Sequence, residues 1–357
     1  MSVTKKRILT LGAGTKNDYE TPPAAYMADA FRQLGHEAEF CYLPVSPREK
    51  NLLLYKFFIR TPFYLQALKY LEKHLEHQSS LYFKKIESYK PDMIFFASFG
   101  DITGQQVRWI KEKYGIPVVF WALGGDEAYV SRFTPFNLDI FTHASHIFIA
   151  DRSWFSTFKL LGKAKLSYLT FGVDPFLYKP LSLKKEFDIG IAAGNMKNDV
   201  PTVIQKGFIL SRLCKEGFQV RASIRNVERL FPILPELKKL DAINEVLPVP
   251  EVNVLYNKSK ISLALNNPQQ KSAPHMRVFE IAAGNNFQLA EYREEMESLF
   301  GDTIISFRSL DELSELTRFY LKHDQERARL AQKSYELVLR EHTSLHRAKK
   351  VLEEVFG

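Results

Sequence analysis

Cysteine is scarce in this sequence of 357 residues: only Cys41 and Cys214 occur. Two cysteines do not imply a disulfide framework, and positions 41 and 214 lie too far apart for the cysteine spacing of a zinc finger. No apolar run is long enough to span a bilayer, and the short apolar segment near the start does not form a signal peptide. We therefore expect a cytoplasmic protein.

Familiar ligand-binding motifs are missing or incomplete as well. Gly12-x-Gly14 follows the first apolar run, but Asn17 replaces the third glycine of a dinucleotide fingerprint, and no acidic residue closes the next strand. NAD is thereby disfavoured, although the Gly14 loop suits either the close approach of another ligand or a plain tight turn. The sequence has no Asp-x-Asp metal motif, and no RNP, zinc-finger or basic-region motif that would predict specific nucleic-acid binding.

The charge balance is basic. Lysine and arginine number 49 against 41 aspartates and glutamates, which gives a formal net charge of +8. Such an excess suits phosphorylated substrates, nucleic acid or anionic lipid, or else forms a solvated basic face. Hydrophobic residues make up 45% of the chain, as in globular proteins, and the length is suited to two domains.

Short apolar runs alternate with helix-like segments along the chain, a pattern typical of α/β folds with parallel sheets. The runs that we expect to be strands are Ile8–Leu11, Ala38–Leu43, Met93–Ala97, Ile116–Trp121, His146–Ala150, Leu166–Phe171, Phe187–Ala193, Gln219–Ile224, Ile243–Leu247, Ile261–Leu265, Phe287–Ala290 and Ile304–Phe307.

The most informative stretch is 275–284, which follows the apolar run Ile261–Leu265 and a polar loop, and reads as a helix that ends at Gly284. Arg277 and Glu280 lie three residues apart and therefore share one face near the helix start. In open α/β sheets, ligands bind where strands end and helices begin. An arginine there can fork onto a phosphate, and a carboxylate can accept hydrogen bonds from sugar hydroxyls. This layout fits a nucleotide-sugar site, but an ordinary ion pair on a helix surface has the same spacing.

Two predicted strands of the first half end in loops that contain glycine and aspartate. Asp101 follows the run Met93–Ala97, and Asp126 follows Ile116–Trp121. Catalytic groups usually lie in such loops of an α/β fold, and a carboxylate can act as a general base. Asp126 could equally be the cap of the next helix.

Residues 47–90 form a long basic and aromatic segment, with helical periodicity from Thr61 to about Tyr89. One interpretation is a helical insertion that packs on the sheet. The other is a basic-aromatic face that touches a membrane surface. We favour packing, because apolar stripes at helical spacing are usually part of a core.

The text of Arg277–Gly284, Glu291–Glu294 and Arg340–Arg347 resembles the CgeB-like glycosyltransferases, which are relatives of the group 1 (family 4) GT-B enzymes. The resemblance covers most of residues 115–357. It implies an α/β GT-B fold, in which two Rossmann-like domains have parallel sheets that face an interdomain cleft. The expected parts are an acceptor domain at 1–175, a linker at 176–186, a donor domain at 187–335 and a C-terminal helix at 336–357 that crosses back to the first domain.

The resemblance implies transfer of a sugar from a nucleoside diphosphate sugar, expected to be UDP-linked. No metal and no other cofactor is expected, because helix dipoles and basic side chains can neutralise the leaving diphosphate. Donor contacts are expected from Gly14, Gly194, Asn195, Lys197, Asn266, His275, Arg277 and Glu280. Glu280 would bind the ribose hydroxyls. Arg277, Lys197 and the loop that begins at Gly194 would hold the diphosphate.

Asp126 is expected to act on the acceptor, and Asp101 is the second candidate for this role. If the transfer inverts the anomeric centre, Asp126 would serve as the general base for the acceptor hydroxyl; if the transfer retains it, Asp126 would orient the acceptor.

One position departs from the family pattern. Family 4 enzymes usually carry two glutamates eight positions apart, and the second matches Glu280, but the first falls on Ser272. His275 and the amides of residues 266–272 would then contact the donor sugar instead.

Two other functions stay open at this point. A GT-B epimerase or hydrolase would act on the nucleotide sugar without an acceptor, and a non-enzymatic basic protein would bind nucleic acid or anionic membrane. For a transferase, the acceptor is expected to be a glycan, a lipid-linked molecule or a protein, as in bacterial surface-glycan synthesis or protein glycosylation. Peripheral contact with the inner face of the membrane would accompany a lipid-linked acceptor.

Overall fold

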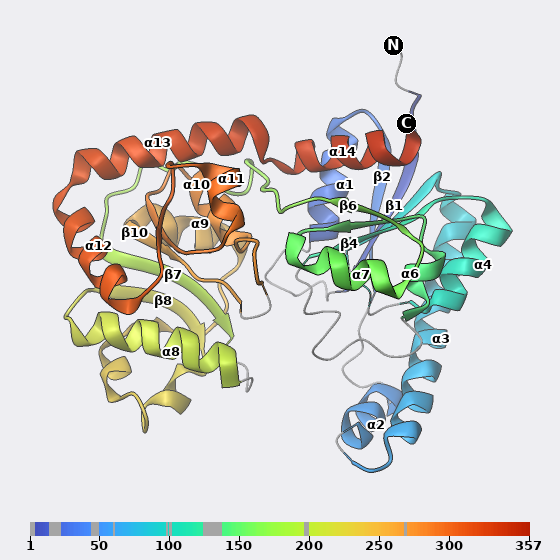
Figure 1. Cartoon of the computed structure of the whole chain (residues 1–357), viewed down its shortest axis with the longest axis horizontal. Coiled ribbons are helices and arrows are strands. Elements are labelled where there is room, and N and C mark those ends of the chain that lie inside the picture. Colours follow the sequence, from blue (N-terminus) through green and yellow to red (C-terminus); the bar gives the residue numbers. More distant parts are fainter. Residues whose placement is uncertain are drawn as a thin grey trace. The chain divides into compact units, whose positions relative to one another are not determined.

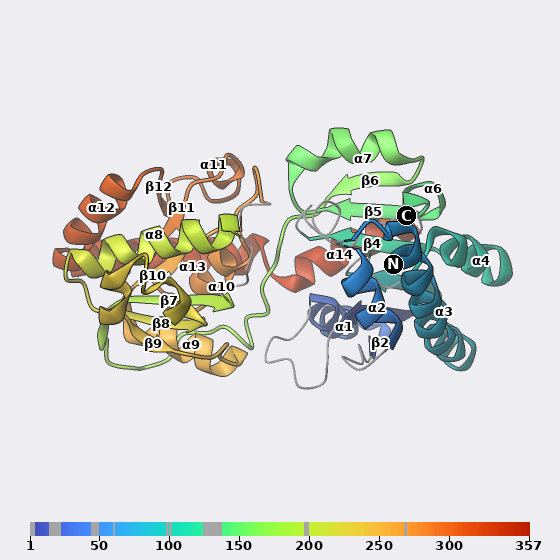
Figure 2. The ribbon, with the colours of Figure 1, turned by 90° about the horizontal axis from the view of Figure 1, so that it is seen from below.

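A computed structural model describes residues 4–13, 23–43, 50–59, 61–97, 99, 102–123, 138–195, 200–267 and 270–357. The chain forms two compact units (Figures 1 and 2). The first comprises Met1–Thr170 together with Arg347–Gly357, and the second comprises Phe171–His346.

The first unit is built on a six-stranded parallel sheet in the order β2-β1-β3-β4-β5-β6. Its strands are β1 (Arg7–Ala13), β2 (Glu37–Leu43), β3 (Met93–Phe96), β4 (Val118–Ala122), β5 (His146–Ile149) and β6 (Lys165–Tyr168). Every residue of β3, β4 and β5 is buried. Burial on both faces is what continuous apolar runs such as Val118–Ala122 predict for parallel strands.

The described helices of the first unit are α1 (Pro23–Gln33), α2 (Lys50–Phe58), α3 (Tyr64–Tyr89), α4 (Gly104–Tyr114), α6 (Ile140–His143), α7 (Phe155–Leu161) and α14 (Ser344–Phe356). Over its described residues, helix α2 packs against α3 and not on the sheet. A capping box between Thr103 and Gln106 starts α4, and Gly115 ends it with φ 67°. The last helix, α14, belongs to this core because Ala348 and Val351 are fully buried among apolar side chains of the first unit.

The second unit is built on a parallel sheet in the order β12-β11-β10-β7-β8-β9. Its strands are β7 (Phe187–Asn195), β8 (Val220–Arg225), β9 (Asp241–Ile243), β10 (Ser259–Ala264), β11 (Gln288–Glu291) and β12 (Ile305–Phe307). The order reverses between β7 and β10, which are direct neighbours. In a doubly wound sheet this switch point is where ligands bind, outside the carboxyl ends of the strands.

The helices of the second unit are α8 (Val200–Lys215), α9 (Val249–Lys258), α10 (Arg277–Ala283), α11 (Glu295–Phe300), α12 (Leu310–Lys322) and α13 (Asp324–Glu341). Short 3₁₀ turns lie at Val227–Leu230 and Pro235–Lys239. The expectation of two parallel α/β sheets is confirmed.

One predicted strand is misplaced. The run Ile243–Leu247 was expected to be a strand, but β9 is Asp241–Ile243 and pairs with β8 from Arg221 to Ser223. The residues after Ile243 leave the sheet because the Ser223 hydroxyl donates to the Glu245 carbonyl oxygen at 2.8 Å and accepts from the Leu247 amide at 3.1 Å. Leu247 is buried without being part of a ladder, so its apolar character misled the assignment.

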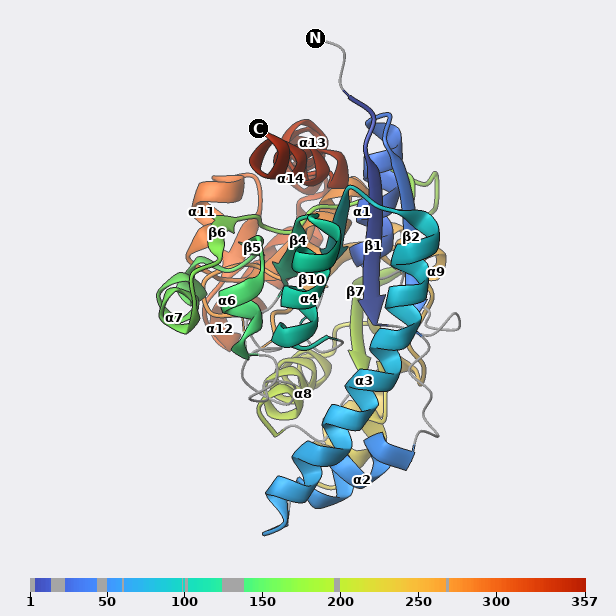
Figure 3. The same cartoon turned by 90° about the vertical axis from the view of Figure 1, so that its right-hand side faces the viewer.

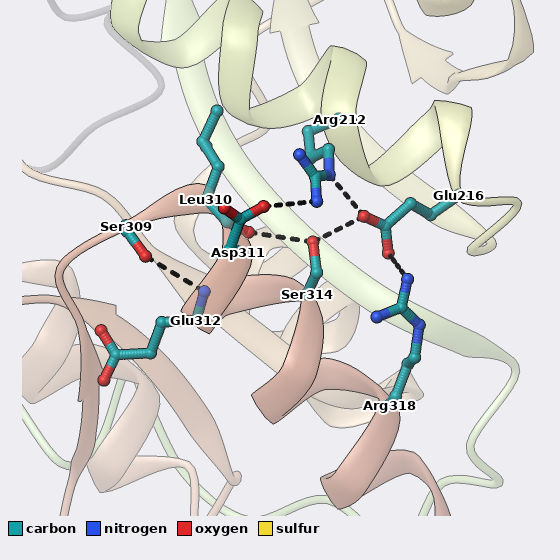
Figure 4. Close-up of polar contacts among 8 residues, drawn as sticks. All are labelled: Arg212, Glu216, Ser309, Leu310, Asp311, Glu312, Ser314 and Arg318. Carbon is teal, nitrogen blue, oxygen red and sulfur yellow. Dashed lines mark hydrogen bonds and ion pairs between the residues drawn. The ribbon is translucent and has the colours of Figure 1, made fainter.

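A polar cluster joins α8 to α12 in the second unit (Figure 4). Glu216, directly after α8, accepts hydrogen bonds from Arg212, from the Ser314 hydroxyl at 2.7 Å and from Arg318 at 2.6 Å. Arg212 also binds Asp311 at 2.7 Å. Burial alone would raise the pKa of Glu216, but the hydrogen bonds from Arg212 and Ser314 and the charge of Arg318 lower it overall. The carboxylate therefore stabilises the packing of the two helices in its ionised form.

We expect Glu216→Gln to lower the free energy of unfolding by about 1–3 kcal/mol, because two arginines lose a buried charged partner. Urea denaturation would measure the change. Glu336→Gln is the matched control. Glu336 is exposed, and its carboxylate accepts a hydrogen bond from the neutral side-chain amide of Gln332. An equal effect of both variants would contradict a stabilising role for this cluster.

Candidate functional site

The candidate site lies at the switch point of the second sheet, where β7 and β10 end side by side. Gly194 is the second-last residue of β7 and follows a β-bulge against β8, and its φ of 75° lies in the left-handed region that glycine adopts without strain. Among the described residues, no heavy atom lies within 4 Å of the place where a Cβ would stand. The glycine is therefore required by the backbone of the bulge.

Asn266, two residues after β10, organises the loop that leads to α10. Its side-chain oxygen accepts from the His275 amide at 2.8 Å, and its side-chain nitrogen donates to the Glu291 carbonyl oxygen at 2.8 Å. Its own amide donates to the Glu291 carboxylate at 3.0 Å. Asn266 is 1% exposed. These contacts fit a residue that positions His275.

His275 is held in one tautomer. Its Nδ1 accepts a hydrogen bond from the Arg277 amide at 3.2 Å, so the neutral ring carries its proton on Nε2. Burial, together with the positive charges of Arg277 and Lys206, lowers the pKa of His275 well below its ordinary value. The imidazole is therefore neutral near pH 7 and offers an Nε2–H donor.

Arg277 and Glu280 lie next to each other on α10, as their spacing predicts. The distance from Arg277 Nη1 to Glu280 Oε2 is 3.8 Å, and the same nitrogen donates to the Tyr256 hydroxyl at 3.5 Å. Glu280 is only 4% exposed. The pair is therefore not the ordinary surface ion pair that the same spacing allows, since a buried carboxylate costs free energy that a surface one does not.

Lys206 is a site residue that the sequence reasoning missed. This lysine of α8 is 8% exposed, and its ammonium donates to the Ala193 carbonyl oxygen at 3.0 Å and to the Asn267 side-chain oxygen at 3.5 Å. A buried cation thus lies between the end of β7 and the loop that follows β10. Its signal in the sequence is that Lys206 shares the apolar helix face of Leu210 and Leu213.

Position 272, where the family pattern predicts an acid, lies beside a glutamate from another part of the chain. The Ser272 hydroxyl donates to Glu295 Oε1 at 2.6 Å, and the Glu295 amide donates to the Ser272 carbonyl oxygen at 3.0 Å. Both residues are buried. The start of α11 thereby brings a carboxylate to the place where the sequence has none.

Four predicted site residues lie outside the described residues: Gly14, Asp101, Asp126 and Lys197. Asn195 is the last residue of β7, and its side chain is not described either. Across the described ranges, no group of three or more His, Cys, Asp or Glu side chains is arranged to hold a metal ion. None of the helices described is long and apolar enough to cross a membrane.

The sequence of this chain is similar to a known protein family and to a curated protein. Residues 221–353, which contain α10, match the family described as glycosyl transferase-like. The spore protein CgeB of Bacillus subtilis is 22% identical over 267 residues, which is 70% of this chain and 78% of that protein. These matches confirm the resemblance to CgeB-like glycosyltransferases.

Solved structures agree on the fold of this chain. Sucrose-phosphate synthase from Thermosynechococcus elongatus superposes with a TM-score of 0.68 at 11% identity, covering 99% of both chains. Anabaena HepE in complex with UDP-glucose superposes with a TM-score of 0.61 at 12% identity, covering 99% of this chain and 100% of that one. The predicted GT-B fold is confirmed.

Proposed function

We propose that this protein transfers a hexose from a UDP-linked sugar to an acceptor hydroxyl. The observation that carries the proposal is the arrangement of Lys206, Arg277 and Glu280 at one edge of the second sheet. Lys206 binds Asn267, and the adjacent Asn266 accepts from the His275 amide just before the helix that carries Arg277, so both cations border the loop after β10. The similarity to HepE, whose structures contain UDP and UDP-glucose, supports UDP as the nucleotide.

Each part of the donor has a partner in this arrangement. Lys206 and Arg277 neutralise the diphosphate, helped by Lys197 and the backbone of the bulge at Gly194. Glu280 accepts hydrogen bonds from the ribose hydroxyls, and the Nε2–H of His275 donates to the sugar or its phosphate. Because side chains supply the positive charge that the leaving UDP needs, we propose a reaction that does not depend on a metal ion.

The acceptor hydroxyl is assigned to Asp126, with Asp101 as the second candidate. Both aspartates follow parallel strands of the first unit in the sequence, since β4 ends at Ala122 and β3 ends at Phe96. This end of a strand is where catalytic groups of α/β folds usually lie. A carboxylate there would accept the proton of the acceptor or orient it.

Calorimetric titration of the full chain with UDP, GDP, dTDP and NAD tests the donor assignment. We expect UDP to bind and NAD to give no heat of binding, because the dinucleotide fingerprint is incomplete. GDP and dTDP are the matched controls, since they carry the same diphosphate on a different base. The absence of binding by all three nucleoside diphosphates would overturn the proposed function.

A further inference from the structure

We propose that the α2–α3 hairpin, residues 50–75, docks on an anionic membrane surface. The two ends of the long helix α3 pack against different parts of the first unit (Figure 3). Near its C-terminal end, Tyr82 and Ile86 are buried in the core of the first unit. Near its N-terminal end, Ala67, Leu71 and Leu75 are buried against α2 instead. The predicted packing role is therefore confirmed for one stripe of α3, and the far end forms a separate small helical hairpin.

The tip of this hairpin exposes large apolar side chains. The exposed fractions are 54% for Leu53, 67% for Phe57, 57% for Phe63, 42% for Tyr64 and 73% for Leu65. Scattered exposed apolar residues are ordinary, but a group of five within 13 consecutive residues is not.

The exposed aromatic rings form one surface. Phe57 and Phe63 both pack edge-on against Phe58, with ring centroids 5.1 Å and 6.2 Å apart, and Phe58 stacks on Tyr70 at 5.8 Å. The patch is thus supported from beneath by the hairpin's own core. An apolar patch at the end of a helix pair is the kind of surface that enters the boundary between lipid headgroups and acyl chains.

The basic charge of the hairpin indicates what kind of partner its apolar patch would bind. Within residues 50–75 the basic residues are Lys50, Lys56, Arg60, Lys69 and Lys73, and the single acidic residue is Glu72. Lys69 and Lys73 are exposed on α3. Two copies of the chain would bring like charges together at this tip, whereas an anionic bilayer offers both an apolar layer and negative headgroups. Apolar and basic groups together therefore favour anionic lipid over self-association.

Vesicle flotation with the full chain tests the proposal. The wild type should float with vesicles of phosphatidylcholine and phosphatidylglycerol, and bind poorly to phosphatidylcholine alone. The triple variant Phe57→Ser, Phe63→Ser, Leu65→Ser should lose affinity for the anionic vesicles by about 100-fold, because three apolar side chains no longer enter the lipid. Lys69→Gln with Lys73→Gln should weaken the binding and make it less dependent on salt.

The chain provides a matched control. Leu160, Phe176 and Ile233 are exposed by 87%, 70% and 73%, and none of them belongs to the hairpin. Their triple replacement by serine should leave vesicle binding unchanged. UDP titration of both triple variants should match the wild type, which separates this proposal from that of the donor site. Equal flotation of the hairpin variant and the wild type would overturn the membrane assignment. Failure of the wild type to float, including the case in which the hairpin captures an acidic protein instead, would overturn it as well.

Discussion

Lys206→Met should lower the affinity for UDP by about 100-fold and leave the affinity for uridine unchanged. The substitution keeps most of the length and the apolar stem of the side chain but removes its positive charge. A charge-assisted contact to a diphosphate in a site shielded from water contributes about 3 kcal/mol, which corresponds to roughly this change in affinity. Titration of the wild type and of Lys206→Met with uridine, UMP and UDP would measure how the loss of affinity grows with the number of phosphates.

A structural role for Lys206 predicts a different result. The ammonium donates to Ala193 and Asn267, so its loss could disturb the end of β7 and the loop that follows β10. Uridine and UDP would then weaken together, and that outcome would rule out a diphosphate contact. Lys206→Arg is the control for charge: it restores a cation and should recover part of the UDP affinity, although its larger planar head does not fit the same two acceptors equally well.

The sheets of this protein follow from the sequence because a parallel strand covered on both faces is a continuous apolar run. The runs around Phe95, Phe120 and Ile261 all belong to observed strands. The same rule fails where burial comes from something other than a sheet. Leu247 is buried in a loop that a hydrogen bond to the Ser223 hydroxyl holds against β8. The periodicity of apolar residues cannot reveal such a bond between a side chain and the backbone.

The candidate site is predictable only where its residues lie close together in the sequence. Arg277 and Glu280 are three residues apart, so helical spacing brings them to one face, and the structure places them together. Lys206 and Glu295 come from other elements, α8 and α11, and reach the site through the folded sheet. No spacing rule connects residue 206 to residue 267. The available signal for Lys206 is a lysine at helical spacing on the apolar face of α8, with Leu210 and Leu213.

Glu280→Gln should remove the ability of the protein to distinguish UDP from dUDP. The proposed contact, in which the buried carboxylate accepts from both ribose hydroxyls, would favour UDP in the wild type, because dUDP lacks one of them. Glutamine offers one neutral acceptor in place of two charged ones. We expect the affinity for UDP to fall by about 2–3 kcal/mol, or roughly 30- to 150-fold, and the affinity for dUDP to fall much less.

The four affinities of this pair of proteins and pair of ligands form a thermodynamic cycle that isolates the contact between Glu280 and the ribose. This matters because Glu280 has a second neighbour: its carboxylate lies 3.8 Å from Arg277, and its replacement also changes the charge around that guanidinium. A change transmitted through Arg277 would act on the diphosphate, which UDP and dUDP share, and would weaken both ligands equally. Equal losses would therefore reassign Glu280 to the positioning of Arg277. Unequal losses would place the ribose of the donor directly on α10.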